Sequence, residues 1–131
     1  MNIATRLDQL EQAEEQRFYA AAAEFAAFWK ANCADDARQG RNDAALRALG
    51  CDGDGAVLAV LARRRLTLSP QERAIEDDLE VAVFGLVEHA HDAAAIRAAL
   101  ARLAPRIGCQ ADDPPVLLVR QLQATIAATP L

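Results

Sequence analysis

The sequence predicts an all-α protein, an irregular bundle of about six helices around a long N-terminal helix. Hydrophobic residues make up 53% of the 131 residues, and alanine is abundant while β-branched runs are few, which favours helices over strands. Apolar residues also recur at steps of three and four, the spacing of a helix face. The length suits one domain, residues 1–131, because no linker is long enough to divide it.

The longest expected helix covers Asn2 to Cys33, and the other helices are expected to pack against it. Five of the six aromatic residues lie in this segment, and no glycine or proline interrupts it. A second apolar stripe begins halfway along it, at Tyr19, Ala22, Ala26, Trp29 and Cys33. The first stripe shares one helical face along the whole length and contains Ile3, Leu7, Leu10, Glu14, Phe18, Ala21, Phe25, Phe28 and Asn32.

The two halves of this helix are expected to have different surroundings. The second half is apolar on two faces, which is typical of a helix surrounded by other elements. The first half carries Asp8, Glu11, Glu14 and Glu15 and is expected at the surface. At about 1.5 Å per residue the helix reaches roughly 45 Å, longer than a domain of this size is wide. Two interpretations stay open for its overhanging turns: part of a long surface helix, or an arm that meets a partner and gives a homodimer.

Turn and capping residues divide the middle of the chain. Residues 34–41 are expected to form a polar connection, after which Asn42 caps a short helix, Asp43 to Leu49, that Gly50 stops. The aspartate- and glycine-rich run 51–55 predicts a tight turn, and residues 56–66 predict the next helix.

The clearest helix start is the run Ser69-Pro70-Gln71-Glu72, in which Ser69 caps and Glu72 completes a capping box. This helix is expected to reach about Ala90. Gly85 lies inside it, which indicates a close crossing by another helix. The expected core face contains Ile75, Leu79, Ala82, Val83, Leu86, Val87 and Ala90.

Two further helices complete the prediction. Asp92 is expected to cap Ala93 to Leu103, which Pro105 and Gly108 end, and Asp113 is expected to start a last helix that frays from Ala127. Their inward residues are Ile96, Leu100, Leu103, Val116, Val119, Leu122 and Ile126. The run from Leu49 to Leu61 also resembles the run from Ile107 to Val119, which indicates two similar hairpins unless the likeness is chance.

Charge and cysteine content exclude several classes of protein. The net charge of −5 opposes binding to phosphate backbones and to anionic lipid, so we expect neither a nucleic-acid nor a membrane partner. No apolar run is long enough for a membrane span, and the acidic start does not resemble a signal peptide. Three cysteines without close spacing, Cys33, Cys51 and Cys109, favour reduced thiols in the cytoplasm.

Three patterns resemble chemical sites, and for each we favour a structural role. Glu88, His89, His91 and Asp92 are zinc-type donors, but His89 and His91 are two residues apart and would point to different sides of a helix. The run 52–55 resembles the start of a calcium loop without its later oxygen ligands. The run 63–65 is all arginine, but the acidic helix that follows opposes DNA. We therefore expect no metal, no cofactor, no catalytic residue and no enzyme, since nucleophile and nucleotide motifs are also missing.

The acidic helix is the preferred functional feature. Glu72, Glu76 and Glu80 are i, i+4 neighbours that mildly destabilise their own helix, and Asp77 and Asp78 widen the patch. A solvated face is the plain interpretation, and a docking face for a basic partner is the functional one. On the functional interpretation, the protein is a small acidic, cytoplasmic, bacterial interaction module of the immunity, chaperone or adaptor type. Its partner-binding residues are Glu72, Glu76, Asp77 and Glu80.

The alternative function is a small-molecule-binding or sensor domain. Its apolar pocket would lie beside the aromatic half of the first helix, lined by Tyr19, Trp29 and Phe84. A hidden enzyme around Glu88, His89 and His91 is the third hypothesis.

Overall fold

The computed structural model describes residues 2–50, 69–88 and 92–130, and over these ranges it contains five helices and no strand. The all-α prediction and the long N-terminal helix are confirmed. The helix expected at 56–66 and the turn at 51–55 lie outside the described residues. The elements are α1 (Ile3–Ala34), α2 (Asp36–Ala48), α4 (Pro70–Leu79) continuing through a π-helical turn (Glu80–Phe84) into α5 (Gly85–Glu88), α6 (Ala93–Leu103) with a 3₁₀ extension (Ala104–Ile107), and α7 (Pro115–Ala128).

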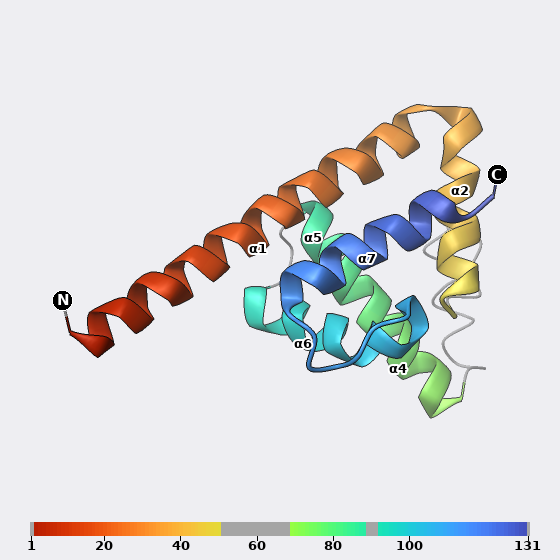
Figure 1. Ribbon diagram of the computed structural model, residues 1–131. Coiled ribbons are helices and arrows are strands. Elements are labelled where there is room, and N and C mark those ends of the chain that lie inside the picture. Colours follow the sequence, from red (N-terminus) through yellow and green to blue (C-terminus); the bar gives the residue numbers. More distant parts are fainter. Residues whose placement is uncertain (1, 51–68, 89–91, 131) are drawn as a thin grey trace.

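Helix α1 crosses the whole molecule, and the other helices gather against its second half (Figure 1). It contacts α2, α5 and α7, while α6 packs between the α4–α5 helix and α7. The N-terminal turns of α1 extend well beyond the body in Figure 1. The predicted overhang is therefore present.

The core lies between α1 and the three helices that follow residue 69. Phe25 is completely buried, and its ring stacks on that of Trp29 with 6.1 Å between centroids. Phe28 is half-buried and packs against the same core. The faces predicted for α4–α5, α6 and α7 point inward, except that Ile75 and Val116 are only half-buried and Ala90 is outside the described residues. Their buried members are Leu79, Ala82, Val83, Leu86, Val87, Ile96, Leu100, Leu103, Val119, Leu122 and Ile126.

The α4–α5 helix changes its winding in the middle, which the sequence does not predict. Residues Glu80–Phe84 form a π-helical turn, and buried Gly85 begins α5 directly after it. Because α5 packs on α1, Gly85 stands where two helices meet, and a residue without Cβ allows a close approach there. This agrees with the expected crossing.

The junction of α1 and α2 differs from the prediction. Asp35 alone joins the two helices with an extended backbone, and its Oδ1 accepts a hydrogen bond from the Ala37 N–H at 2.9 Å. Residues 36–41, expected as a polar connection, are helical. Asn42 lies inside α2 and is not a cap. The capping aspartate starts the helix seven residues early, and Gly40 is tolerated inside it.

Asn42 instead forms a buried pair with Asn32, and these two side chains are only 1% and 3% exposed. The Asn32 Nδ2 donates to Asn42 Oδ1 at 2.9 Å, and Asn42 Nδ2 donates to the Trp29 carbonyl at 3.4 Å. The pair explains why a polar residue, Asn32, stands on the apolar face of α1. Since a buried amide is costly unless it is hydrogen-bonded, the pair fixes the register of α2 on α1.

The cap at the start of α6 is the predicted one, but the cap at the start of α7 is not. Asp92 caps α6 as predicted, with its Oδ1 accepting from the Ala95 N–H at 2.7 Å. Gly108 takes a left-handed conformation, φ 74°, at the end of the 3₁₀ extension. Asp113 does not cap α7, because its Oδ2 accepts from the Gln110 N–H and Pro114 occupies the cap position. Helix α7 continues through Ala127 to Ala128.

Replacing the Asn32–Asn42 pair one side chain at a time should reveal its coupling. We expect Asn42→Leu or Asn32→Leu alone to lower the free energy of unfolding by about 1–3 kcal/mol, because each leaves a buried amide without its partner. The double variant, which removes both amides, should cost less than the sum of the single changes. Urea denaturation measures all four proteins, and strictly additive costs would contradict the coupling.

Substitution of Gly50 and of Gly40 by alanine should have opposite effects on the free energy of unfolding. Gly50 has φ 108°, and a Cβ there would lie 3.0 Å from the Ile75 Cγ2. Gly50→Ala should therefore lower the free energy of unfolding by about 1–3 kcal/mol. Gly40 lies in α2, and a Cβ added to it would have open space for 4 Å around it, so Gly40→Ala should raise stability by about 0.5–1 kcal/mol. Thermal unfolding of both variants checks the contrast.

Candidate functional site

The acidic face of α4 is smaller than the sequence predicts. Glu76 is only 9% exposed, and Asp78, expected to widen the patch, is also 9% exposed and accepts a hydrogen bond from Arg102 Nε at 2.8 Å. Asp78 is the sequence neighbour of core residue Leu79 and pairs with Arg102 of α6, against which α4 packs. Ser69 caps α4 as predicted, with its Oγ accepting from the Glu72 N–H at 3.2 Å, and its hydroxyl donates to Glu72 Oε1 at 3.0 Å in place of the backbone N–H that a capping box uses. Glu72, Asp77 and Glu80 remain exposed.

The other patterns with possible chemistry fall mostly outside the described residues. His89, His91, Cys51 and the runs 52–55 and 63–65 belong to this group. Over residues 2–50, 69–88 and 92–130, no group of three or more His, Cys, Asp or Glu side chains could hold a metal ion. In the same ranges no helix combines the length and the apolar character that crossing a membrane requires.

The three aromatic residues expected to line one pocket are divided between two places. Trp29 is buried and meets Phe84 edge-on, with 6.4 Å between ring centroids. Tyr19 is 48% exposed, and its hydroxyl donates to Glu15 Oε1 at 3.3 Å. Tyr19 lines a pocket of about 350 Å³ beside Gly85, Ile96 and other residues, but Trp29 and Phe84 do not line it. Of the three, Trp29 alone is buried in the core, since Phe84 is 40% exposed.

The first part of α1, Ile3–Arg17, forms a projecting arm. The Asn2 side chain accepts a hydrogen bond from the Thr5 N–H at 2.8 Å and caps the helix at its start. No side chain of the arm is buried, and the apolar residues Ile3, Leu7 and Leu10 are 77%, 53% and 63% exposed. The apolar face that is core beyond residue 18 therefore continues into solvent.

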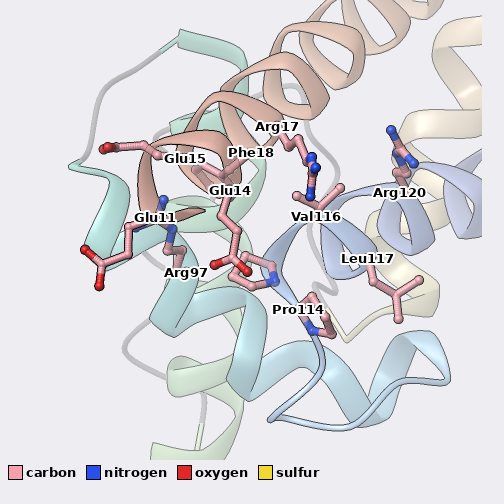
Figure 2. Close-up of a pocket in the computed structure, with 11 residues that line it drawn as sticks. Glu11, Glu14, Glu15, Arg17, Phe18, Arg97, Pro114, Val116, Leu117 and Arg120 are labelled. Atoms are coloured by element: carbon pink, nitrogen blue, oxygen red, sulfur yellow. The ribbon is translucent and has the colours of Figure 1, made fainter. Parts of the chain in front are cut away.

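Where the arm leaves the body, it borders a pocket of about 860 Å³, here named the arm pocket (Figure 2). In Figure 2 the Glu14 side chain points from α1 toward Pro114 at the start of α7. One wall belongs to α1, and the facing wall, here the body wall, belongs to α6 and to the beginning of α7. The lining residues are Glu11, Glu14, Glu15, Arg17 and Phe18 on α1, and Arg97, Pro114, Pro115, Val116, Leu117 and Arg120 on the body wall.

The arm pocket combines an apolar surface with charges of both signs. Phe18 is buried at its inner end, and the Arg97 guanidinium lies over the Phe18 ring, 4.6 Å from its centroid, in a cation–π contact. Val116 is half-buried, and Leu117 is 46% exposed. A helix with an apolar stripe and charged flanks would match this surface.

Sequence reasoning missed this pocket because its walls are about 80 residues apart in the chain. One local signal was available. Glu14 interrupts the apolar stripe of α1 at the position where the pocket opens, and in the sequence it stands out only as a polar exception. The arm itself was predicted, but not the surface beside it.

The two described cysteines should differ in reactivity. Burial, and then the Asp113 carboxylate, raise the pKa of the Cys109 thiol, so less of it is thiolate at a given pH. Cys33 is exposed. With iodoacetamide at a pH of about 8, we expect Cys33 to be alkylated first and Asp113→Asn to speed the reaction of Cys109, both followed by peptide mass spectrometry. Faster labelling of Cys109 in the unmodified protein would contradict this.

Comparison with protein-family models, with curated proteins and with solved structures finds no match to this chain. An account of its function therefore has to come from its own residues. Among those described, the arm and the arm pocket combine exposed apolar side chains with a cavity.

Proposed function

We propose that this protein is a small acidic protein-interaction module whose docking surface is the arm together with the arm pocket. One observation carries the proposal. The apolar stripe of α1 does not end with the core at Phe18 but continues through Leu10, Leu7 and Ile3 into solvent, beside a pocket of about 860 Å³. Exposed apolar surface that continues from a pocket is typical of protein-binding sites.

The energetics favour a docked partner. The arm extends a helix that is already formed, but most helical stability in proteins comes from packing of an apolar face, and the apolar face of the arm is exposed in a single chain. Each large apolar side chain that a partner covers contributes about 1.5–3 kcal/mol. Docking along Ile3, Leu7 and Leu10 would therefore stabilise both the complex and the helical state of the arm. A partner helix is the natural occupant, since helix-in-groove binding buries such a stripe.

The lining of the arm pocket supports a macromolecular partner over a small molecule. Small-molecule sites are mostly apolar with a few polar groups, whereas six of the eleven residues that line this pocket are charged. Its volume alone would suit a small ligand of ordinary size, about 300–1,000 Å³. A small molecule that co-purifies with the protein and is displaced by substitutions at Phe18 or Val116 would favour the sensor hypothesis instead.

The acidic surface fits a basic partner, as the sequence suggests. Net charge is −5, and Glu72, Asp77 and Glu80 stay exposed on the α4–α5 helix. These carboxylates would speed the approach of a basic protein more than they would hold it. A cytoplasmic location, inferred from the three cysteines, and a bacterial source remain part of the proposal.

Two matched double variants test the docking surface. Leu7→Glu with Leu10→Glu places two charges on the apolar stripe, and Gln9→Glu with Gln12→Glu adds the same charge on the far side of the arm. All four positions are exposed, so both variants should fold. We expect the stripe variant to lose protein partners captured from native lysate by about tenfold or more, and the far-side variant to keep them.

The lysate experiment also tests the exposed carboxylates of the α4–α5 helix separately from the arm. Glu72→Lys with Glu80→Lys should slow the capture of a basic partner in low salt and leave its dissociation nearly unchanged. Equal capture by the wild type and the stripe variant would contradict the arm as a docking surface for a different protein.

A further inference from the structure

We infer that the arm of a second copy of this chain occupies the arm pocket, running antiparallel to the resident arm in a twofold dimer. The inference rests on the proposed docking function and names its partner. It starts from a simple fact: each copy offers one unpartnered apolar stripe and one pocket in which such a stripe fits.

The shape of the molecule selects the antiparallel direction. In Figure 1 the body lies along one side of α1. This is the side of the exposed stripe, because Phe18 and Phe25 continue that stripe along the helix and are buried in the core. A parallel second arm facing the stripe would bring both bodies into one space. An antiparallel arm points its own body away from this one, and its first turns point into the arm pocket.

The length of the arm sets the register. Fifteen residues, Ile3–Arg17, span about 22 Å at about 1.5 Å per residue, and Leu10 is their midpoint. If two arms overlap over this whole length, Leu10 lies next to its equivalent at the twofold axis. Ile3 of one copy then lies opposite Arg17 of the other, which lines the arm pocket next to Phe18. Three large apolar side chains from each copy would be covered.

One pair of opposite charges meets in this arrangement. The resident α1 wall of the arm pocket carries Glu11, Glu14 and Glu15, and the part of the second arm that enters the pocket, residues 3–9, carries Arg6 and Asp8. In the register centred on Leu10, Arg6 of one copy lies opposite Glu14 of the other, the carboxylate that points into the pocket in Figure 2. The one acidic interruption of the stripe thus meets a cation.

In a twofold dimer, the arm and the arm pocket of both copies are occupied at the same time. In an isologous contact the same surface serves on each side, so each arm fills the partner's pocket and none is left over. Assembly therefore stops at two chains. The contact would also hold both arms helical, since each supplies the apolar surface that the other lacks.

Light scattering during size exclusion tests the dimer with the full chain. At micromolar to millimolar concentrations we expect the mass to approach twice the 14.1 kDa of one chain, and helix content by circular dichroism to rise with concentration. The stripe variant, Leu7→Glu with Leu10→Glu, should stay at the mass of one chain. The far-side variant, Gln9→Glu with Gln12→Glu, should dimerise like the wild type. A wild type that stays at the mass of one chain throughout overturns the inference.

Disulfide trapping tests the direction of the arms in a Cys33→Ser background, which removes the exposed thiol. We expect Leu10→Cys to form a disulfide-linked dimer readily, and Ile3→Cys to link to Arg17→Cys on another copy but not to itself. Rapid linking of Ile3→Cys to itself indicates parallel arms and overturns the arrangement.

The two proposals fail in different ways. If the protein stays at the mass of one chain while the stripe variant loses a captured partner, docking on the arm stands and the second copy is the wrong occupant. If neither mass nor capture depends on the stripe, both proposals fail.

Discussion

The burial of the second half of α1 is the constraint on which the rest of this structure depends. Phe18, Phe25 and Trp29 place large rings on one helix, and α2, α5 and α7 all pack against it. Alanine-rich helices have little apolar surface of their own, so a shared aromatic helix lets them bury enough to fold. The buried Asn32–Asn42 hydrogen bond makes this packing specific, because the bond forms in only one register of α2 on α1.

The same helix creates the surface with which we associate function. Helix α1 is 32 residues long, and the body covers only its second half. Nothing in the first half stops the helix, since Asn2 caps it at the far end and the residues between favour helix. The apolar stripe therefore emerges from the core with Glu14 as its one acidic interruption, and the pocket beside it follows from the place where α6 and α7 meet α1. Core and docking surface are two parts of one continuous face.

Much of the fold could be predicted because its signals are local. Ser69, Asp92 and Gly108 start or end helices through contacts within a few residues, and the core faces follow from apolar spacing. The predictions were wrong where a residue type has two common structural roles. Asn42 has the chemistry of a cap but is a buried partner of Asn32, and Asp35 has the chemistry of a loop residue but caps α2.

The candidate site could be predicted only in part. The arm followed from the length of α1 and from the change in its polarity near the middle. The acidic face of α4 looked larger in sequence, because spacing along a helix cannot say that Glu76 and Asp78 are buried in the folded chain. The arm pocket forms where residues of α1, α6 and the beginning of α7 come together. These segments are far apart in the chain, so no pattern within one of them indicates the pocket.

By itself, the sequence determined that this protein is helical, that its aromatic helix is the centre of the core, and that the first turns of this helix overhang. These properties depend on spacing and capping, which act over a few residues. Only the tertiary structure decided which carboxylates reach solvent, how Asn32 is satisfied, and where the apolar stripe borders a pocket. Such features depend on how distant helices pack, because burial and hydrogen bonding between them are properties of the assembled core.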